Sequence, residues 1–311
     1  MEIMLSAILT VVGLIMLCFG GNWLVSGGVA IAKKFRISNL VIGMTIVAYG
    51  TSTPELAASV AAAGEHSAII LGNIIGSNIA NVGMVIGIAA IIVPLAVRKS
   101  VLKKEIPIML GVSVLLVLIS IDGEISQYDG ILLLGGLGAF AVYTFKDAMK
   151  QREKNKEEIV SEKKNIYLKS AGLIGLGVGL LYVGAILTVD NAVILAKEFG
   201  LSEKIIGLTV IAIGTSLPEL ITSIIAIRKG HADIGVGNII GSNIYNILMI
   251  MGVGATLGGV MIVSDVYVDY AIMIIFSLSL LIALKTGIIN RVMGICLSIG
   301  YVAYLAVTFF K

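Results

Sequence analysis

Residues 46–56 read IVAYGTSTPEL, and residues 210–220 read VIAIGTSLPEL. Each stretch carries one glutamate, Glu55 or Glu219, in the middle of an apolar segment. A carboxylate inside the hydrocarbon of a bilayer is energetically expensive, and such groups usually serve a function. Two of them at equivalent points of a duplicated unit predict one binding site that is shared between two halves of the chain.

A second motif follows each copy of the first. It reads GNIIGSNIAN at residues 72–81 and GNIIGSNIYN at residues 237–246. The duplication also extends upstream, because residues 37–56 and 201–220 are identical at 11 of 20 positions. The repeat is therefore a unit of structure and not a short coincidence.

The two motifs supply side chains that carry oxygen, with no histidine and no cysteine among them. All-oxygen sites favour hard cations such as Ca²⁺, Mg²⁺ and Na⁺ over Zn²⁺ or Cu²⁺. Two ionised carboxylates held close together repel, so an empty pair is expected to take up a proton or a metal ion, and one Ca²⁺ neutralises both. The set comprises Thr51, Ser52, Glu55, Asn73, Ser77 and Asn81 in the first copy and Thr215, Ser216, Glu219, Asn238, Ser242 and Asn246 in the second.

A proline, Pro54 or Pro218, directly precedes each glutamate. Proline lacks an N–H, and its ring clashes with the carbonyl four residues earlier, so each helix is expected to kink or unwind there. Backbone carbonyls around residues 48–51 and 212–215 would lose their helical partners. At membrane depth such carbonyls are tolerated only where they are buried or line a wet cavity, and a cation would satisfy them.

The composition is that of an integral membrane protein. Hydrophobic residues make up 58% of the chain and charged residues 13%, with a mean hydropathy of +1.05, whereas soluble domains carry about 25% charged residues. The net charge of +3 resides in loops, which is a topology signal and gives no indication of nucleic-acid binding.

A helical span needs about 20 apolar residues. Ten such segments are predicted, at residues 4–31, 38–63, 68–94, 105–121, 127–145, 168–195, 204–228, 234–262, 267–284 and 290–310.

The polar segment 146–165 divides these spans into two groups of five. Of the 22 lysines and arginines, only Lys197, Lys204 and Lys311 fall on the side opposite this segment. Cytoplasmic loops are enriched in Lys and Arg. The sequence therefore predicts a protein of the plasma membrane whose central loop is cytoplasmic and whose termini are both extracellular.

Five spans is an odd number, so the second group enters the membrane upside down relative to the first. Inverted repeats with a site near the midplane are typical of secondary transporters. The predicted fold is an all-α membrane protein of ten transmembrane helices, in which the two glutamate-bearing helices are broken. It consists of a first five-helix repeat at 1–145, a linker at 146–167 and a second, inverted five-helix repeat at 168–311.

Glycines are dense in spans 1 and 6. Small residues allow helices to approach closely, so these glycines serve either packing alone or a sliding contact between the two spans. They are Gly13, Gly20, Gly21, Gly27 and Gly28 in span 1 and Gly172, Gly175, Gly177, Gly179 and Gly184 in span 6.

Cys18 and Cys296 lie in apolar runs and are expected to be buried thiols, too few for a disulfide framework or a metal cluster. His66 and His231 lie in the short loops after the glutamate helices. A surface role is expected for both.

GTSxPE and GSNxxN, each present twice, resemble the alpha repeats of the sodium/calcium exchangers of the cation/Ca²⁺ antiporter superfamily, most closely its small prokaryotic members. The resemblance covers essentially the whole chain. It implies that Glu55 and Glu219 are the central Ca²⁺ ligands, that the carbonyls of Thr51 and Thr215 complete this shell, and that spans 1 and 6 slide to alternate access. The other implied ligands are the carbonyls of Ala48 and Ala212 with Ser52, Ser216, Ser77 and Ser242 for flanking Na⁺ sites, and Asn81 and Asn246 facing the middle position.

One departure from some relatives concerns charge. Potassium-dependent members are among those that carry Asp at one of the two Asn positions, whereas Asn81 and Asn246 are both amides here. Two formal negative charges argue against K⁺ co-transport and fit neutralisation by one Ca²⁺. The family implies three Na⁺ per Ca²⁺, and hence electrogenic exchange.

The predicted function is secondary Na⁺/Ca²⁺ antiport by alternating access. The alternative is exchange of H⁺ for Ca²⁺ or of another divalent cation, although that family usually shows a different acidic motif. Broken inverted repeats favour alternating access over an open channel. Enzyme activity is not expected, because no span offers a paired Asp, a Ser–His pair or a His cluster. A P-loop is also absent, so nothing suggests ATP-driven pumping. Expected partners are Ca²⁺, Na⁺, H⁺ as a competitor and the lipid bilayer, with no cofactor, nucleic acid or obligate protein partner.

Overall fold

The computed structural model describes residues 2–64, 66–154, 166–200, 212–262 and 266–310. Their backbone is almost entirely helical. This is the expected solution for an apolar chain, since a helix satisfies its own backbone hydrogen bonds where lipid cannot.

The first half of the described chain contains long helices and one helix in several pieces. Its elements are α1 (Glu2–Phe35), α2 (Asn39–Ile42), η1 (Gly43–Val47), α3 (Ala48–Thr51), α4 (Thr53–Ala62), α5 (Ser67–Ala80), η2 (Asn81–Ile86), α6 (Gly87–Ile92), β1 (Leu95–Ala96), η3 (Val101–Glu105), α7 (Ile106–Ile119), β2 (Glu124–Ile125) and α8 (Gln127–Lys154).

The second half has a similar order of elements along the chain. Its described elements are α9 (Ile166–Glu198), α11 (Ala212–Thr215), α12 (Leu217–Arg228), α13 (Ala232–Tyr245), η5 (Asn246–Met251), α14 (Gly252–Gly258), β3 (Val260–Met261), α15 (Val266–Ser279), η6 (Leu280–Ile282), α16 (Ala283–Thr286), β4 (Ile288–Ile289) and α17 (Arg291–Phe310).

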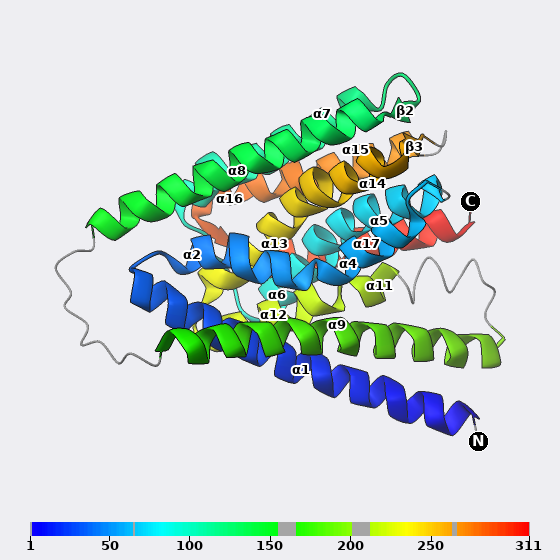
Figure 1. Ribbon diagram of the computed structural model, residues 1–311, viewed down its shortest axis with the longest axis horizontal. Coiled ribbons are helices and arrows are strands. Elements are labelled where there is room, and N and C mark those ends of the chain that lie inside the picture. The colour runs from blue at the N-terminus through cyan, green and yellow to red at the C-terminus, as the bar shows by residue number, and fades with distance from the viewer. Residues whose placement is uncertain (1, 65, 155–165, 201–211, 263–265, 311) are drawn as a thin grey trace.

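The long helices run roughly along the long axis of the molecule (Figure 1). The described N- and C-terminal residues lie at one end of that axis, whereas α8 ends and α9 begins at the other (Figure 1). We call these the terminal end and the linker end.

Among the described residues, seven helices are long and apolar enough to cross a membrane. The structure thus supports a multi-pass membrane protein, while the predicted number of ten spans is not reached on this measure. The physical reason is that several predicted spans do not form one long continuous helix in the described residues. The segment predicted at 38–63 is divided into pieces by a break at Ser52, α7 alone is 14 residues long, and the segment predicted at 204–228 lies partly outside the described residues.

Two helical columns form the centre of the bundle. The apolar windows of Ser67–Ile92 and Ala232–Gly258 are each 83% buried, whereas those of α1, α8, α9 and α17 are 17% to 28% buried. The columns are therefore surrounded by protein, and the long helices around them offer apolar surfaces to lipid.

Two small antiparallel strand pairs tie the first half of the chain to the second. In one pair Leu95 of β1 lies opposite Ile289 of β4, and in the other Glu124 of β2 lies opposite Met261 of β3. Each pair closes backbone hydrogen bonds in loops at opposite ends of the bundle.

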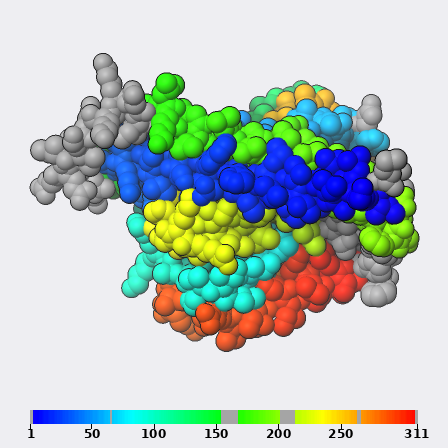
Figure 2. Space-filling model, turned by 90° about the horizontal axis from the view of Figure 1, so that it is seen from below, coloured from blue at the N-terminus to red at the C-terminus, as the bar shows by residue number. Residues whose placement is uncertain are grey.

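Helices α1 and α9 cross on the outside of the bundle through a row of glycines. A Cβ atom on Gly20 would lie 2.8 Å from the carbonyl oxygen of Gly177, and one on Gly184 would lie 2.9 Å from that of Gly13. The backbones touch, so side chains are excluded here for steric reasons. Figure 2 shows α1 in blue stretched along this face of the molecule, with α12 in yellow beside it.

The expectation of buried thiols is wrong. Cys18 on α1 and Cys296 on α17 are both exposed free cysteines. In a membrane protein an apolar run does not distinguish a packed face from a face turned to lipid, because both are equally apolar.

Candidate functional site

The glutamate helices are broken as their prolines predict. Helix α3 ends at Thr51, Ser52 leaves helical geometry with φ −83° and ψ 8°, and α4 restarts at Thr53. In the second half, Ser216 has φ −89° and ψ 2° between α11 and α12. Each glutamate therefore lies in the first turn of a new helix, in the middle of the bundle.

Both carboxyl groups are removed from solvent and lie next to each other. Glu55 is 2% exposed and Glu219 is 1% exposed, and their carboxyl groups are within hydrogen-bonding reach of one another. Burying two carboxylates together is unfavourable unless a cation or a proton compensates them. The fold thus brings the two predicted carboxylates, 164 positions apart in the sequence, into one group.

Hydroxyl groups from both halves surround Glu219. The Ser52 hydroxyl donates to Glu219 Oε1 at 3.2 Å, and the Ser242 hydroxyl donates to the same oxygen at 3.4 Å. The Thr51 hydroxyl donates to Asn238 Oδ1 at 3.0 Å and lies 3.4 Å from the Ser242 hydroxyl. The first-half and second-half motifs are therefore interleaved and form a single polar cluster.

Two further asparagines hold the glutamate helices in place. Asn73 Nδ2 donates to the backbone carbonyl of Glu55 at 3.2 Å and to Ser59 Oγ at 3.1 Å. Asn238 Nδ2 donates to the carbonyl of Glu219 at 3.5 Å and to Ser223 Oγ at 3.0 Å. Each amide binds a carbonyl at a broken helix start, so it fixes the position of the carboxylate beside it.

The predicted asparagines Asn81 and Asn246 begin the π-helical turns η2 and η5. Such turns occur often at functional sites because they displace side chains from regular helical positions. Asn81 Nδ2 donates to Asn243 Oδ1 at 2.9 Å, and Asn246 Nδ2 donates to Asn78 Oδ1 at 3.0 Å. The side-chain nitrogens of Asn81 and Asn246 are therefore used in these hydrogen bonds, and their side-chain oxygens are not.

Asn78 and Asn243 lie beside the candidate site, although the sequence analysis does not single them out. Each is 1% exposed, and each also donates at 3.4 Å to the backbone carbonyl of the other. They form a symmetric clamp between the two central columns. The signal for them in the sequence is the first asparagine of GSNxxN, whereas Asn81 and Asn246 are its last asparagine.

Several buried oxygens in this cluster have no hydrogen-bond partner. Among the described residues, nine buried side-chain polar atoms lack one, and six of the nine belong to predicted site residues. Unpaired buried polar atoms are costly and rare, so a concentration of them at one point indicates a place for a ligand that supplies positive charge. The six atoms are Glu55 Oε2, Ser77 Oγ, Asn81 Oδ1, Ser216 Oγ, Glu219 Oε2 and Asn246 Oδ1.

The backbone carbonyls are less free than predicted. The carbonyl of Ala48 accepts from Ser52 N at 3.0 Å and lies 3.2 Å from the Thr51 hydroxyl. A cation at this carbonyl would have to share it or displace a donor. Ala212 and Thr215 form the two ends of the short helix α11, and the residues that precede Ala212 lie outside the described chain.

Within the described chain no group of three or more His, Cys, Asp or Glu residues could hold a metal ion. The candidate site is consequently built from two carboxylates with amides and hydroxyls. This donor set suits a hard cation that is bound and released, and it does not suit a resident soft metal.

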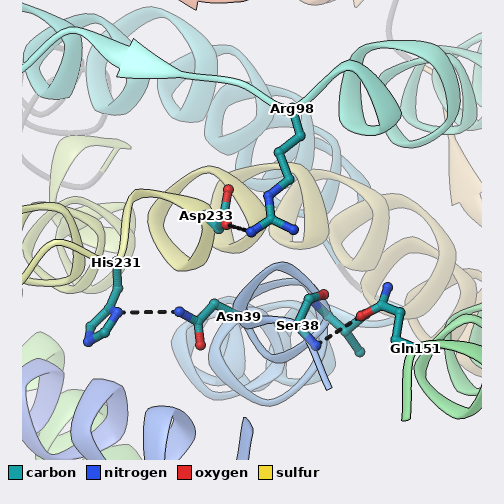
Figure 3. A network of polar contacts seen from close by, with 7 residues as sticks. Ser38, Asn39, Arg98, Gln151, His231 and Asp233 are labelled. Atoms are coloured by element: carbon teal, nitrogen blue, oxygen red, sulfur yellow. Dashed lines mark hydrogen bonds and ion pairs between the residues drawn. The ribbon is translucent and has the colours of Figure 1, made fainter. Parts of the chain in front are cut away.

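Polar contacts close the bundle at the linker end (Figure 3). Arg98, in the loop after α6, forms an ion pair of 2.6 Å with Asp233 of α13. The backbone N–H of Ser38, at the start of α2, donates to Gln151 Oε1 of α8 at 2.9 Å. The ion pair joins the two halves, whereas the hydrogen bond joins two elements of the first half.

His231 takes part in the same closure. Its Nδ1 lies 3.3 Å from Asn39 Nδ2 (Figure 3). Partial burial lowers the pKa of the His231 imidazole, and the charges of Lys33 and Lys229 lower it further. His231 is therefore partly buried and contacts Asn39 at this end of the bundle, outside the carboxylate cluster.

Comparison with known proteins agrees with this geometry. The family described as sodium/calcium exchanger protein matches residues 5–146 and 169–310. The chain belongs to that family. The resemblance inferred from the two motifs is thus confirmed, and the protein is a multi-pass membrane protein of a family of cation/Ca²⁺ antiporters.

Relatives of this family member align over nearly their whole length. The chain is 33% identical to the sodium/calcium exchanger MaX1 of Methanosarcina acetivorans, covering 99% of each protein, and 36% identical to the inner membrane protein YrbG of Escherichia coli, covering 98% of this chain and 97% of that one. A solved structure of the sodium-calcium exchanger NCX_Mj, soaked with zero Na⁺ and Ca²⁺, superposes with a TM-score of 0.85 at 35% identity, covering 98% of this chain and 99% of that one.

Proposed function

We propose that this protein exchanges Na⁺ for Ca²⁺ across the plasma membrane. The observation that carries the proposal is the adjacent, buried pair Glu55 and Glu219, surrounded by unpaired oxygens from both halves of the chain. One Ca²⁺ would cancel both negative charges and supply the missing partner of several oxygens at once. The family and the relative MaX1 support the same pair of ions.

The ion roles follow the oxygen set. Glu55 and Glu219, with the carbonyls of Thr51 and Thr215, bind Ca²⁺ in the centre. Na⁺ occupies flanking positions, and the unpaired amide oxygens of Asn81 and Asn246 support their assignment to the middle position. The proposed Na⁺ ligands are the carbonyls of Ala48 and Ala212 with Ser52, Ser216, Ser77 and Ser242, and the middle position is lined by Asn81 and Asn246.

The proposed architecture is ten transmembrane helices in two inverted repeats, at 1–145 and 168–311, joined by the cytoplasmic linker 146–167. The strand pairs support it. The strands β1 and β3 hold equivalent places in the two halves, and so do β2 and β4, so exchanging the halves turns the β1–β4 pair into the β3–β2 pair. The two segments matched by the family, 5–146 and 169–310, support the same boundaries.

The proposed orientation puts both termini outside the cell and the linker inside. The described ends of the chain lie together at the terminal end, and α8 and α9 meet the linker at the opposite end (Figure 1). The enrichment of Lys and Arg in loops of the linker end supports a cytoplasmic position of that end.

Alternating access is proposed to use the glycine contact between α1 and α9. These helices touch through backbone atoms at their glycines, and Leu17, Leu24 and Leu181 pack in one buried cluster beside that contact. In this proposal, the smooth glycine faces let α1 and α9 slide during the transport cycle. Opening at the linker end would also require release of the Arg98–Asp233 ion pair.

The test is uptake of ⁴⁵Ca²⁺ into proteoliposomes with and without an outward Na⁺ gradient. Na⁺-driven uptake that is lost when the gradient is collapsed is the expected result. Uptake that follows a proton gradient in Na⁺-free buffer would favour the H⁺/Ca²⁺ alternative. Uptake driven by neither gradient, by purified and monodisperse protein, would contradict cation-coupled Ca²⁺ exchange.

A further inference from the structure

A cavity of about 390 Å³ lies beside the carboxylate cluster, between α4, α5, α11, α15 and α17. Part of its lining is apolar or small, from Ala58, Ala68, Ile69, Gly72, Gly76 and Leu305. Polar side chains also line it, and they include Ser77 and Thr215 of the candidate site together with Asp269 and Tyr304. The cavity therefore joins predicted site residues to a carboxylate that the proposed ion cluster does not include.

The α5 wall of the cavity is open because it is formed by glycine. A Cβ atom added to Gly72 or Gly76 would meet no described atom within 4 Å. On the same helix, Ser77 is 3% exposed and its hydroxyl has no hydrogen-bond partner among the described residues. A buried, unpaired hydroxyl on the wall indicates that this space serves a polar occupant.

Asp269 lies in the first turn of α15, toward the terminal end, and is half-buried. The Tyr304 hydroxyl of α17 donates a hydrogen bond to its carboxylate. This bond holds the negative charge against the cavity wall. A carboxylate with low-dielectric walls around it concentrates cations and accelerates their arrival, most strongly at low ionic strength.

We propose that Asp269, oriented by Tyr304, is a cation-recruiting residue that attracts hydrated Na⁺ or Ca²⁺ into this cavity on the way to Ser77. The inference rests on the proposed cation exchange for its biological role. The charge selectivity of the cavity is a separate physical property and can be measured without transport.

The first measurement uses thiol reagents of opposite charge. In a background with Cys18→Ala and Cys296→Ala, Gly76→Cys places a thiol on the cavity wall, with Gly72→Cys as a second position. Cationic MTSET is expected to react faster than anionic MTSES. Adding Asp269→Asn should lower the MTSET/MTSES rate ratio about tenfold at low ionic strength. Adding Asp122→Asn should leave it unchanged, because Asp122 is exposed and does not line the cavity.

An unchanged ratio in Asp269→Asn, or thiols at both positions that react with neither reagent, would overturn the inference whatever the transport activity is.

The second measurement separates recruitment from the transport cycle. Asp269→Asn is expected to raise the apparent KM for Ca²⁺ about three- to tenfold at low ionic strength, with an unchanged maximal rate. The increase should shrink when choline chloride is added.

Tyr304→Phe keeps the ring and removes only the hydrogen bond, so a smaller rise of KM is expected. A loss of maximal rate with unchanged KM in either variant would mean a structural role and would contradict recruitment. Wild-type proteoliposomes without any Na⁺-dependent Ca²⁺ flux would contradict the proposed function, while the MTSET/MTSES rate ratio of the Gly76→Cys variant would still decide the inference about Asp269.

Discussion

Asn81 Nδ2 donates a 2.9 Å hydrogen bond to Asn243 Oδ1, and this bond joins two residues that are 162 positions apart in the sequence. Its counterpart joins Asn246 to Asn78 at 3.0 Å. Because both pairs cross between the two central columns, they fix the distance between the halves next to the carboxylates. They also occupy the amide nitrogens, so only the oxygens of Asn81 and Asn246 remain for an ion.

The first prediction concerns this clamp. A double-mutant cycle with Asn81→Ala and Asn243→Ala is expected to give a coupling free energy of about 1 kcal/mol, because a buried neutral hydrogen bond contributes roughly that much. Reversible unfolding in mixed micelles, without Ca²⁺, measures it. Purely additive effects would mean that the pair does not hold the columns together.

The second prediction concerns the carboxylates. Glu55→Gln and Glu219→Gln are each expected to abolish Ca²⁺ transport, since a neutral amide cannot replace a charge that the ion must balance. Saturation of the wild type at about 100 times Kd should add about 2.7 kcal/mol of stability, and this Ca²⁺-dependent gain should disappear in both variants.

Glu105→Gln is the matched control for the carboxylates. Glu105 is also buried, at 3% exposure, and hydrogen-bonds Tyr143 outside the site. It should retain the thermal shift caused by Ca²⁺. Near-normal flux in either site variant would remove the two-carboxylate site from the mechanism.

The third prediction separates protons at the site from protons at the surface. The pKa of His231 is lowered in the folded protein, so the unfolded chain binds the proton more readily, and this imidazole lowers stability as pH falls below its ordinary value of about 6.5. His231→Gln should flatten the pH dependence of unfolding in that window.

Ca²⁺ exchange should behave differently. Protons compete with Ca²⁺ for the carboxylates, so exchange is expected to slow at low pH in the wild type and equally in a variant that lacks both His66 and His231. If the double replacement abolished the pH dependence of flux while transport persisted, proton competition at Glu55 and Glu219 would be the wrong explanation.

The fourth prediction concerns the contact between α1 and α9. In Gly20→Ala the new Cβ would lie 2.8 Å from the Gly177 carbonyl oxygen and 2.9 Å from the Leu181 backbone nitrogen. Neither atom can rotate away, so the helices must separate, and a loss of about 1–3 kcal/mol in stability is expected. Gly175→Ala on the same α9 is the control, because its Cβ would meet no described atom within 4 Å. Thermal unfolding of the two variants side by side measures the difference, and equal midpoints would rule out a tight contact.

The local chemistry of the sequence predicted much of the site. Proline before glutamate fixed the helix breaks at Ser52 and Ser216, and the spacing of oxygens predicted a cluster that the fold does assemble. These features depend on a few neighbouring residues. The family was identified from the same motifs.

Contacts across the halves could not be read in this way. Asn78 and Asn243 look like ordinary polar residues until the two columns are placed side by side, and the ion pair of Arg98 with Asp233 joins a loop to a distant helix. The exposed Cys18 was missed for another reason, since lipid-facing and packed surfaces share one composition. The ten predicted spans stay a prediction, because broken or short helices and residues outside the described chain leave seven that are long and apolar enough on their own.

The last prediction concerns charge. With Asn81 and Asn246 neutral, the ionised site carries two negative charges, which one Ca²⁺ cancels and three Na⁺ exceed by one. Each cycle should then move one net charge, and the membrane potential contributes about 2.3 kcal/mol per charge per 100 mV. In proteoliposomes clamped with K⁺ and valinomycin, an inside-positive potential should favour Ca²⁺ entry, because the net charge leaves with Na⁺. The final Ca²⁺ accumulation ratio should change about 50-fold per 100 mV, since 1.4 kcal/mol corresponds to a factor of ten.

Replacing K⁺ by choline in the absence of valinomycin should leave exchange intact. A ratio that ignores the clamp would indicate electroneutral exchange of two Na⁺ or two H⁺ for one Ca²⁺, and the inference from the two asparagines to a third Na⁺ would fail.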